Sequence, residues 1–350
     1  MNQSRIKYFL ISSLLIHFSF FAENAYSYAS AEDMTVDASF RVMCYNIHHC
    51  DPPYNTGEAT DIDTIIGVIA KQNPDIVALQ EVDVYTTRSG SNVHQAKVIA
   101  DRLGMNYFFA PAINYQGGKY GVAILSKFPM SENNLLELPR PDVNGEKRVL
   151  ARSKITLSDG TFIRFGCTHF DLKTDNKRAQ VAKVNELALS ESLPFIIAGD
   201  LNATEGSIVI NTLDDVFTRS CTGCSPTSPA RNPQNTIDYI AYRHPENNFS
   251  IVSHKTVNET FASDHRPIVA VIGYQKIITD PNGTQSPGIA PVKLIGRKLI
   301  SEVPTSISIF NLLGVLLYQQ SLNTTFDIPA RIGKGIYLVK TSNGSNKIIL

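Results

Sequence analysis

Eight residues that can do acid–base or metal chemistry stand at the ends of six short apolar runs in this 350-residue chain: Asn46, Glu81, His169, Asp200, Asn202, Asp238, Asp264 and His265. In four of the runs the polar residues follow the apolar ones, and in the other two they precede them. If the last two strands run antiparallel to the first four, all eight side chains meet at one edge of the sheets. Carboxylate and amide oxygens suit Mg²⁺ or Mn²⁺ better than zinc, and the two histidines add groups for proton transfer. The set predicts hydrolysis of a phosphoester by water activated beside a divalent cation.

The elements that must position these residues follow from the apolar patterns. Near-continuous apolar runs predict strands that are covered on both faces, over residues 40–45, 75–80, 162–167, 195–198, 239–242 and 267–272. Helical spacing predicts three helices, near 62–69, 93–103 and 175–189. We expect Thr60 and Asp63 to cap the first helix as a pair and Gly104 to end the second. Strands interleaved with helices predict a layered α/β domain.

Seven motifs occur in the order seen in the endonuclease/exonuclease/phosphatase superfamily, which has the deoxyribonuclease-I-like fold. They are Tyr45–His48, Leu79–Val82, Tyr120–Lys127, Thr168–Phe170, Gly199–Asn202, Ile237–Tyr239 and Ser263–Ile268. Single motifs of this kind are weak, but seven in order resemble this family strongly over roughly residues 40–273. The resemblance implies a four-layered α/β sandwich, in which helices flank two packed mixed sheets.

The resemblance also assigns roles around a metal ion. It implies that Asn46 and Glu81 belong to the metal site, with Glu81 the principal ligand, and that Asp264 assists the metal or its waters. His48 departs from the acidic residue that some relatives carry two positions after the Asn. One metal ligand is therefore missing or replaced, and the number of ions stays open.

For the phosphate side, the resemblance implies that Asp200 orients or deprotonates the attacking water and that Asn202 fixes this water and the phosphate. His265, oriented by Asp238, would hydrogen-bond a phosphate oxygen, and His169 would bind phosphate or protonate the leaving oxygen. Phosphate would also be bound by Arg148, although two other arginines of this region, Arg140 and Arg152, are alternatives.

The first 31 residues have the three-part layout of a secretory signal peptide. Arg5 and Lys7 precede an apolar run of about 14 residues, and small residues follow at 29–31. The run is too short to span a bilayer, which takes about 20 residues. We therefore expect an exported mature chain without a transmembrane helix.

Turn-rich sequence predicts a linker over 276–288, between a catalytic domain at 32–275 and a β-rich module at 289–350. Residues 309–314 and 333–340 resemble the C-terminal sorting domain of type IX secretion in Gram-negative bacteria. The resemblance implies the secretion machinery as a partner, and a protein that is secreted or attached to the outer membrane surface. We expect a monomer.

The charge balance bears on the substrate. Basic and acidic residues number 32 each, and the segment 32–282 holds 23 basic against 29 acidic residues. This balance favours a lipid headgroup or another small phosphoester over an extracellular nuclease, whose groove is normally basic. A non-catalytic surface binding protein on a hydrolase scaffold is a third possibility, which the complete set of polar residues disfavours.

Three further features have less specific interpretations. His48, His49 and His94 are expected in loops or at the surface. The basic residues around Lys177 (Lys173, Lys177, Arg178 and Lys183) are expected to form a solvated face or to steer anionic substrates. Cys221 and Cys224 predict a local disulfide, because a zinc site would need two more ligands and the sequence has no second Cys-x-x-Cys.

Overall fold

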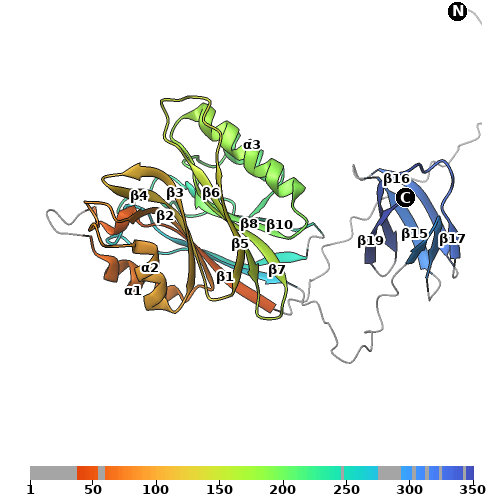
Figure 1. Ribbon diagram of the computed structural model, residues 1–350, viewed down its shortest axis with the longest axis horizontal. Coiled ribbons are helices and arrows are strands. Elements are labelled where there is room, and N and C mark those ends of the chain that lie inside the picture. The colour runs from red at the N-terminus through yellow and green to blue at the C-terminus, as the bar shows by residue number, and fades with distance from the viewer. Residues whose placement is uncertain are drawn as a thin grey trace, which may run out of the picture. The chain divides into compact units, whose positions relative to one another are not determined.

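The computed structural model describes residues 38–53, 60–245, 248–274, 293–301, 305–311, 315–322, 325–341 and 344–350. The chain divides between Lys276 and Ile277 into two compact units, which are treated separately below (Figure 1). The predicted signal peptide and the predicted linker lie outside the described residues, so both stay predictions. In the described part of the chain, no helix has the length and apolar character needed to cross a membrane.

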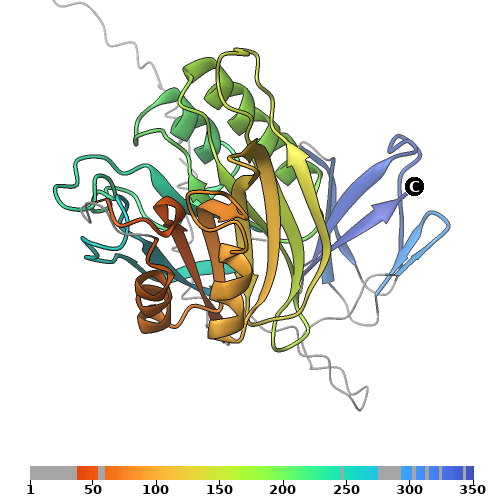
Figure 2. The same cartoon turned by 60° about the vertical axis from the view of Figure 1, so that its left-hand side comes forward.

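The first unit contains two six-stranded mixed sheets (Figures 1 and 2). The first sheet has the order β11-β12-β1-β2-β4-β3, formed by Phe249–Thr256, Ile268–Tyr274, Ala38–Asn46, Ile76–Val84, Gly118–Ser126 and Asn106–Tyr115. The second has the order β5-β6-β7-β8-β10-β9, formed by Met130–Glu137, Val149–Thr156, Phe162–His169, Phe195–Asp200, Asp238–Arg243 and Thr218–Arg219. Within each sheet one pair is parallel, β1 with β2 and β7 with β8, and the other neighbours are antiparallel.

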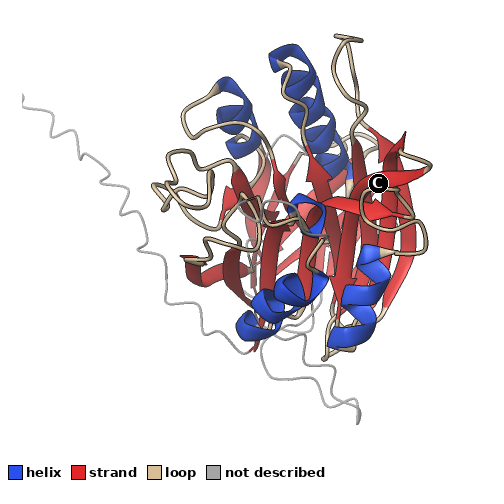
Figure 3. Ribbon diagram, turned by 90° about the vertical axis from the view of Figure 1, so that its left-hand side faces the viewer, coloured by secondary structure: helices blue, strands red, loops and turns tan. Residues whose placement is uncertain are grey.

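The main core lies between the two sheets, where apolar side chains of both inner faces pack together. Helices α1 and α2 cover the outer face of the first sheet, and α3 and α4 cover the outer face of the second. Figure 3 shows these helices on two opposite sides of the strands. The predicted four-layered α/β sandwich is therefore confirmed.

The helices follow the sequence pattern with one correction at an end. Helix α1 (Ile62–Gln72) is capped by Asp61, whose Oδ1 accepts from the Thr64 backbone N–H at 2.9 Å. The expected pair of Thr60 and Asp63 is therefore wrong, because the helix begins one residue later than that pair requires. Gly104, in the left-handed conformation at φ 65°, ends helix α2 (Gln95–Leu103) as predicted.

The other two helices lie on the second sheet. The predicted third helix is α3 (Thr174–Ser190). Helix α4 (Ile208–Asp214) was not predicted, since seven residues give too few turns for a clear apolar period.

The second unit is a small β-sandwich, in agreement with the predicted β module. One sheet has the order β13-β14-β17, formed by Lys293–Ile295, Lys298–Ile300 and Thr325–Asp327. The other has the order β16-β15-β18-β19, formed by Leu316–Leu322, Thr305–Phe310, Ile336–Thr341 and Gly344–Ile349. Leu299, Ile307, Phe326 and Val339 from both sheets share one buried cluster.

Strand β8 lies so close to β7 at Gly199 that this position has no room for a side chain. A Cβ atom added at Gly199 would lie 2.3 Å from the Thr168 carbonyl oxygen, a backbone atom that cannot move aside without disturbing the sheet. We predict that Gly199→Ala lowers the free energy of unfolding by about 1–3 kcal/mol, the usual cost of overpacking. Urea unfolding of the purified chain measures this change.

Gly67 provides the matched control, because it is exposed in helix α1 and an added Cβ meets nothing within 4 Å. Gly67→Ala should raise the free energy of unfolding by about 0.5–1 kcal/mol, through the lower conformational entropy of alanine in the unfolded chain. Equal stability of Gly199→Ala and the unmodified chain would contradict the close approach of β7 and β8.

Candidate active site

The predicted site residues of the second sheet meet because of the strand register. Asp200 ends β8, and it pairs with His169 at the end of β7 and with Asp238 at the start of β10. Since β10 runs antiparallel to β8, its first residue lies at the edge where the other two strands end. The sheet thereby brings two carboxylates and one imidazole together without any loop.

Asn46, at the end of β1, links this group to the first sheet. Its Nδ2 donates to Glu81 Oε1 at 3.0 Å and to Asp200 Oδ2 at 3.1 Å. The backbone carbonyl of Asn46 accepts from Ser263 Oγ at 2.7 Å, and its Oδ1 accepts from the His48 N–H at 3.1 Å. Asn46 is therefore held by four hydrogen bonds, three through its side-chain amide and one through its backbone carbonyl, and the amide links the two sheets.

Glu81 lies at a β-bulge inside β2, not beyond the end of a strand as expected. The pairing with β4 shifts between Leu79 and Val82, and Glu81 has φ 58°. A non-glycine residue in the left-handed region is strained, and a bulge is a common way to redirect a side chain. The bulge leaves Glu81 half-buried, where its carboxylate meets the Asn46 amide.

His265 and Asp238 form a buried carboxylate–imidazole pair. His265 Nδ1 lies 2.9 Å from Asp238 Oδ2, and its Nε2 lies 3.7 Å from Asp200 Oδ2. Burial acts to lower the pKa of His265, but the charge and hydrogen bond of Asp238 outweigh it, with smaller contributions from Asp200 and Asp264. The pKa of His265 is raised to about 10, so this ring is an imidazolium at neutral pH.

Asp200 is poised to exchange a proton near neutral pH. Burial and the negative charge of Asp238 raise its pKa to about 7, against the lowering effect of His265 and of hydrogen bonds from Asn202 and Asn46. A carboxylate with this pKa is a far stronger base than an exposed one, whose pKa is about 4. Asp200 can therefore accept a proton from a nearby water.

His169 is held in its neutral form. Burial, followed by the charges of Arg148 and His265, lowers its pKa well below the ordinary value. Asn202 Nδ2 lies 3.1 Å from His169 Nε2 and donates to the Phe170 carbonyl at 2.9 Å. Since the amide donates, Nε2 is the accepting nitrogen and Nδ1 carries the hydrogen.

A small pocket beside His169 presents two hydrogen-bond donors without partners. Arg148, Tyr120 and His169 line it together with Gly121. Arg148 Nε and His169 Nδ1 are buried and have no hydrogen-bond partner among the described residues. Arg148 also pairs with Glu146 at 3.2 Å. Unpartnered buried donors are costly, and an acceptor brought by a substrate would stabilise either of them.

The alternatives to Arg148 are engaged elsewhere. Arg140 donates to the Gly145 carbonyl at 3.1 Å, and Arg152 donates from Nε to Asn134 Oδ1 at 3.1 Å. Among the three arginines, Arg148 is the one that lines the pocket beside His169.

The donor set at this edge fits a hard divalent cation. Glu81 and Asp264 are half-buried carboxylates, and Asp200 and Asp238 are nearly fully buried. Asp238 Oδ1 has no hydrogen-bond partner among the described residues, and Asp200 and Asp238 repel each other. A cation near these oxygens would relieve that repulsion, and its ligands would be oxygens as Mg²⁺ requires.

Sequence reasoning missed contacts of three residues. Lys177 Nζ donates to the Asn202 carbonyl at 2.6 Å, so this lysine supports the site and does not belong to a solvated face. Ser263 bonds the backbone of Asn46, and its Oγ also accepts from the His265 N–H at 3.2 Å. His49, expected in a loop or at the surface, lies in a short turn after β1 and is buried. The sequence carries no signal for these contacts, which join segments far apart in the chain.

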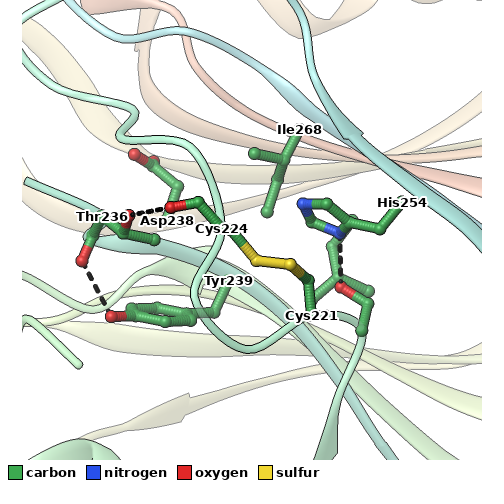
Figure 4. Close-up of a pocket in the computed structure, with 9 residues that line it drawn as sticks. Cys221, Cys224, Thr236, Asp238, Tyr239, His254 and Ile268 are labelled. Carbon is green, nitrogen blue, oxygen red and sulfur yellow. Dashed lines mark hydrogen bonds between the residues drawn. A yellow bond between two sulfur atoms is a disulfide. The ribbon is translucent and has the colours of Figure 1, made fainter. Parts of the chain in front are cut away.

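The predicted Cys221–Cys224 disulfide is present beside the site (Figure 4). It lines a second small pocket with Asp238 and His254, and Thr236 Oγ1 donates to the Cys224 carbonyl at 3.3 Å. The disulfide therefore braces the loop that leads into β10. Cys44, Cys50 and Cys167 are buried free thiols.

Comparison with known proteins identifies the family of the chain. A family model described as the endonuclease/exonuclease/phosphatase family matches residues 43–265. No protein in the set of curated proteins matches the chain.

Solved structures show the same fold. An endonuclease/exonuclease/phosphatase from Beutenbergia cavernae is 18% identical with a TM-score of 0.57, over 89% of this chain and 100% of the other. A mannosyl-6-phosphatase from Bacteroides thetaiotaomicron is 16% identical with a TM-score of 0.56, over 67% and 99%. The human Nocturnin catalytic domain is 19% identical with a TM-score of 0.54, over 69% and 95%.

The contact between Asp238 and His265 leads to a prediction about the pKa of His265. Asp238→Asn removes the charge that contributes most to raising the pKa of His265, so this pKa should fall from about 10 back toward the ordinary value of 6.5. NMR titration of the ring protons measures the change.

Asp264→Asn is the control for this titration, because Asp264 contributes least among the acidic neighbours of His265. Its effect on the pKa should be clearly smaller. Equal shifts in the two variants would show that the direct contact with Asp238 is not what charges the ring.

Proposed function

The chain belongs to the endonuclease/exonuclease/phosphatase family, a family of phosphoester hydrolases, and from this we propose an exported, Mg²⁺-dependent hydrolase of a lipid headgroup or another small phosphoester. The observation that carries the proposal is the contact of Asp200, a base with a pKa near 7, with the imidazolium of His265 at 3.7 Å. Attack of water on phosphorus is favoured by a base that accepts the proton of the water and by a nearby cationic donor that stabilises the charge on the phosphate.

In this proposal Asp200 accepts a proton from the attacking water. The water oxygen forms a bond to phosphorus while the bond from phosphorus to the leaving oxygen breaks. The leaving oxygen takes a proton from solvent, and Asp200 releases to solvent the proton that it accepted. Asn202 can orient the water through Oδ1, because the bonds to Phe170 and His169 occupy both hydrogens of its amide nitrogen. Fixing the phosphate as well would require one of these bonds to open. Asn46, which donates to Asp200, keeps the reactive carboxylate in place.

Charge that develops on the phosphate meets donors from two sides. His265 donates from Nε2, and Asp238 fixes its ring through Nδ1. Arg148 and His169 donate from the adjoining pocket. Because His169 is neutral, its role is hydrogen bonding to phosphate, which we favour over protonation of the leaving oxygen.

The divalent cation would be held by Asn46, Glu81 and Asp264, and the donor chemistry favours Mg²⁺, with Mn²⁺ as a substitute. When bound, it supplies Lewis-acid stabilisation of phosphate charge and orients water. In this structure Asn46 contributes by donating from Nδ2 to Glu81 and Asp200. Offering its oxygen to the cation would require the amide to turn and would break both bonds.

One solved structure of the same fold is a mannosyl-6-phosphatase, which supports a small phosphoester as the substrate. The excess of acidic residues in 32–282 also disfavours a long polyanion such as DNA. The complete set of polar residues at the sheet edge favours catalysis over the role of a surface binding protein.

Export is part of the proposal and rests on the sequence. The signal-peptide pattern of residues 1–31 and the resemblance of the C-terminal unit to a type IX sorting domain support a secreted or surface-attached protein that the secretion machinery handles. The proposed form is a monomer.

A substrate panel tests the activity. The purified chain with Mg²⁺ should hydrolyse phosphatidylinositol, sphingomyelin or a sugar phosphate faster than it nicks plasmid DNA. Asp200→Asn should lower the rate by about 10²–10⁴-fold, the usual contribution of a general base.

Asp63→Asn, which alters an exposed carboxylate paired with Arg102, should leave the rate unchanged. Nicking of plasmid as the sole activity would identify a nuclease. No hydrolysis of any phosphoester with Mg²⁺ or Mn²⁺ would favour a binding protein.

The pH profile tests the assignment of base and donor. Asp200 must be ionised and His265 protonated, so kcat/KM should rise as the pH passes about 7 and fall as it passes about 10. In Asp238→Asn the falling limb should move to lower pH, since the ring then loses its proton sooner. A falling limb that stays in place in this variant would refute the role of His265.

A further inference from the structure

Two consecutive histidines lie next to Glu81 at the edge of the first sheet. His48 and His49 form the short 3₁₀ helix η1 (His48–Cys50) directly after β1, and their ring centroids are 4.5 Å apart. One ring nitrogen of each histidine and one Glu81 oxygen lie within 4.8 Å of one another. Nothing in the proposed hydrolysis uses either imidazole.

The hydrogen bond of His48 leaves one nitrogen ready to bind a metal. His48 Nδ1 lies 2.6 Å from the Asp51 carbonyl oxygen. Because a carbonyl can only accept, Nδ1 carries the hydrogen and Nε2 carries the lone pair. A neutral imidazole whose far nitrogen donates to a backbone carbonyl is the usual state of a histidine that ligates a metal.

His49 supplies the second, independent observation. Only 8% of its surface is exposed, and its buried Nδ1 has no hydrogen-bond partner among the described residues. The other nitrogen, Nε2, lies 3.6 Å from Asp51 Oδ2. A buried nitrogen without a partner is costly, and a bound cation would satisfy it.

The backbone holds both rings in place. His48, His49 and Cys50 all have positive φ, at 45°, 43° and 58°. Gln95 Nε2 donates to the His49 carbonyl at 2.5 Å, which fixes this strained segment to helix α2. Such strain persists only where surrounding contacts determine it.

We propose that His48, His49 and Glu81 form a site for a transition-metal cation, selected over Mg²⁺. Two imidazoles and one carboxylate suit Zn²⁺, Co²⁺, Mn²⁺ or Fe²⁺, whereas Mg²⁺ takes oxygen ligands. Metal–ligand bonds of about 2.0–2.2 Å would bring the three atoms together after a small movement of the side chains. The inference rests on the proposed function in one respect, because Glu81 also serves the cation of that function. The two roles are compatible because one carboxylate oxygen of Glu81 would bind the transition metal and the other the Mg²⁺.

Co²⁺ binding to the full chain tests this site. Visible absorption and calorimetry should show Co²⁺ binding that persists in millimolar Mg²⁺. His48→Asn and His49→Asn should each weaken this binding at least about tenfold, the scale set by removal of even an indirect metal contact. Asparagine is chosen because it tolerates positive φ better than other residues.

His94→Asn is the matched control, since asparagine can replace His94 as the N-cap of α2, and Co²⁺ binding should not change. Unaltered Co²⁺ affinity in the His48→Asn, His49→Asn double variant, or displacement of Co²⁺ by Mg²⁺, would overturn the proposal.

A measurement on the unsubstituted chain covers the case in which the variants do not fold. The Co²⁺ form should show paramagnetically shifted exchangeable imidazole resonances in NMR spectra, and their absence would overturn the site. Histidine-dependent Co²⁺ binding without hydrolysis of any phosphoester under any metal would overturn the proposed function alone.

Discussion

The site depends on two carboxylates that are buried side by side and share contact with one imidazolium. Asp200 and Asp238 occupy facing positions on β8 and β10, and both are almost fully buried. Burial and mutual repulsion would be prohibitive for two free charges. His265 bonds Asp238 and approaches Asp200, which offsets part of this repulsion. The part that is not offset raises the pKa of Asp200. Asp238 thereby orients the His265 ring, and Asp200 becomes a base that works near neutral pH.

The sandwich makes this arrangement possible because strand ends from both sheets meet at one edge. Each sheet has a parallel pair at its centre with an antiparallel neighbour, so chain segments that end and segments that begin share that edge. Asn46 spans the two sheets by donating to Glu81 and Asp200. The large core between the sheets fixes their spacing, and the polar groups at the edge therefore need few loops to support them.

Two groups of residues near the buried carboxylates have different chemistry. Arg148, His169 and Tyr120 line a small pocket with buried donors, which suits an anion. Glu81 lies with the His48 and His49 rings, which suits a cation. A phosphoester needs both, since its negative oxygens pair with donors while the cation offsets charge that develops during attack. The bulge at Glu81 connects the two groups, because it turns that carboxylate toward Asn46.

The sequence by itself determined the layers and most of the site. Apolar runs gave six strands, helical spacing gave three helices, and the polar residues at the run ends predicted a shared edge. Tertiary structure alone decided how those residues are used: the bulge that places Glu81, the burial of His49, the reach of Lys177 to Asn202, and the choice of Arg148 over Arg140 and Arg152. Local patterns cannot specify these features, because each depends on contacts between distant segments. The bond from Asn46 to Asp200 crosses 154 positions, and the one from Ser263 to Asn46 crosses 217.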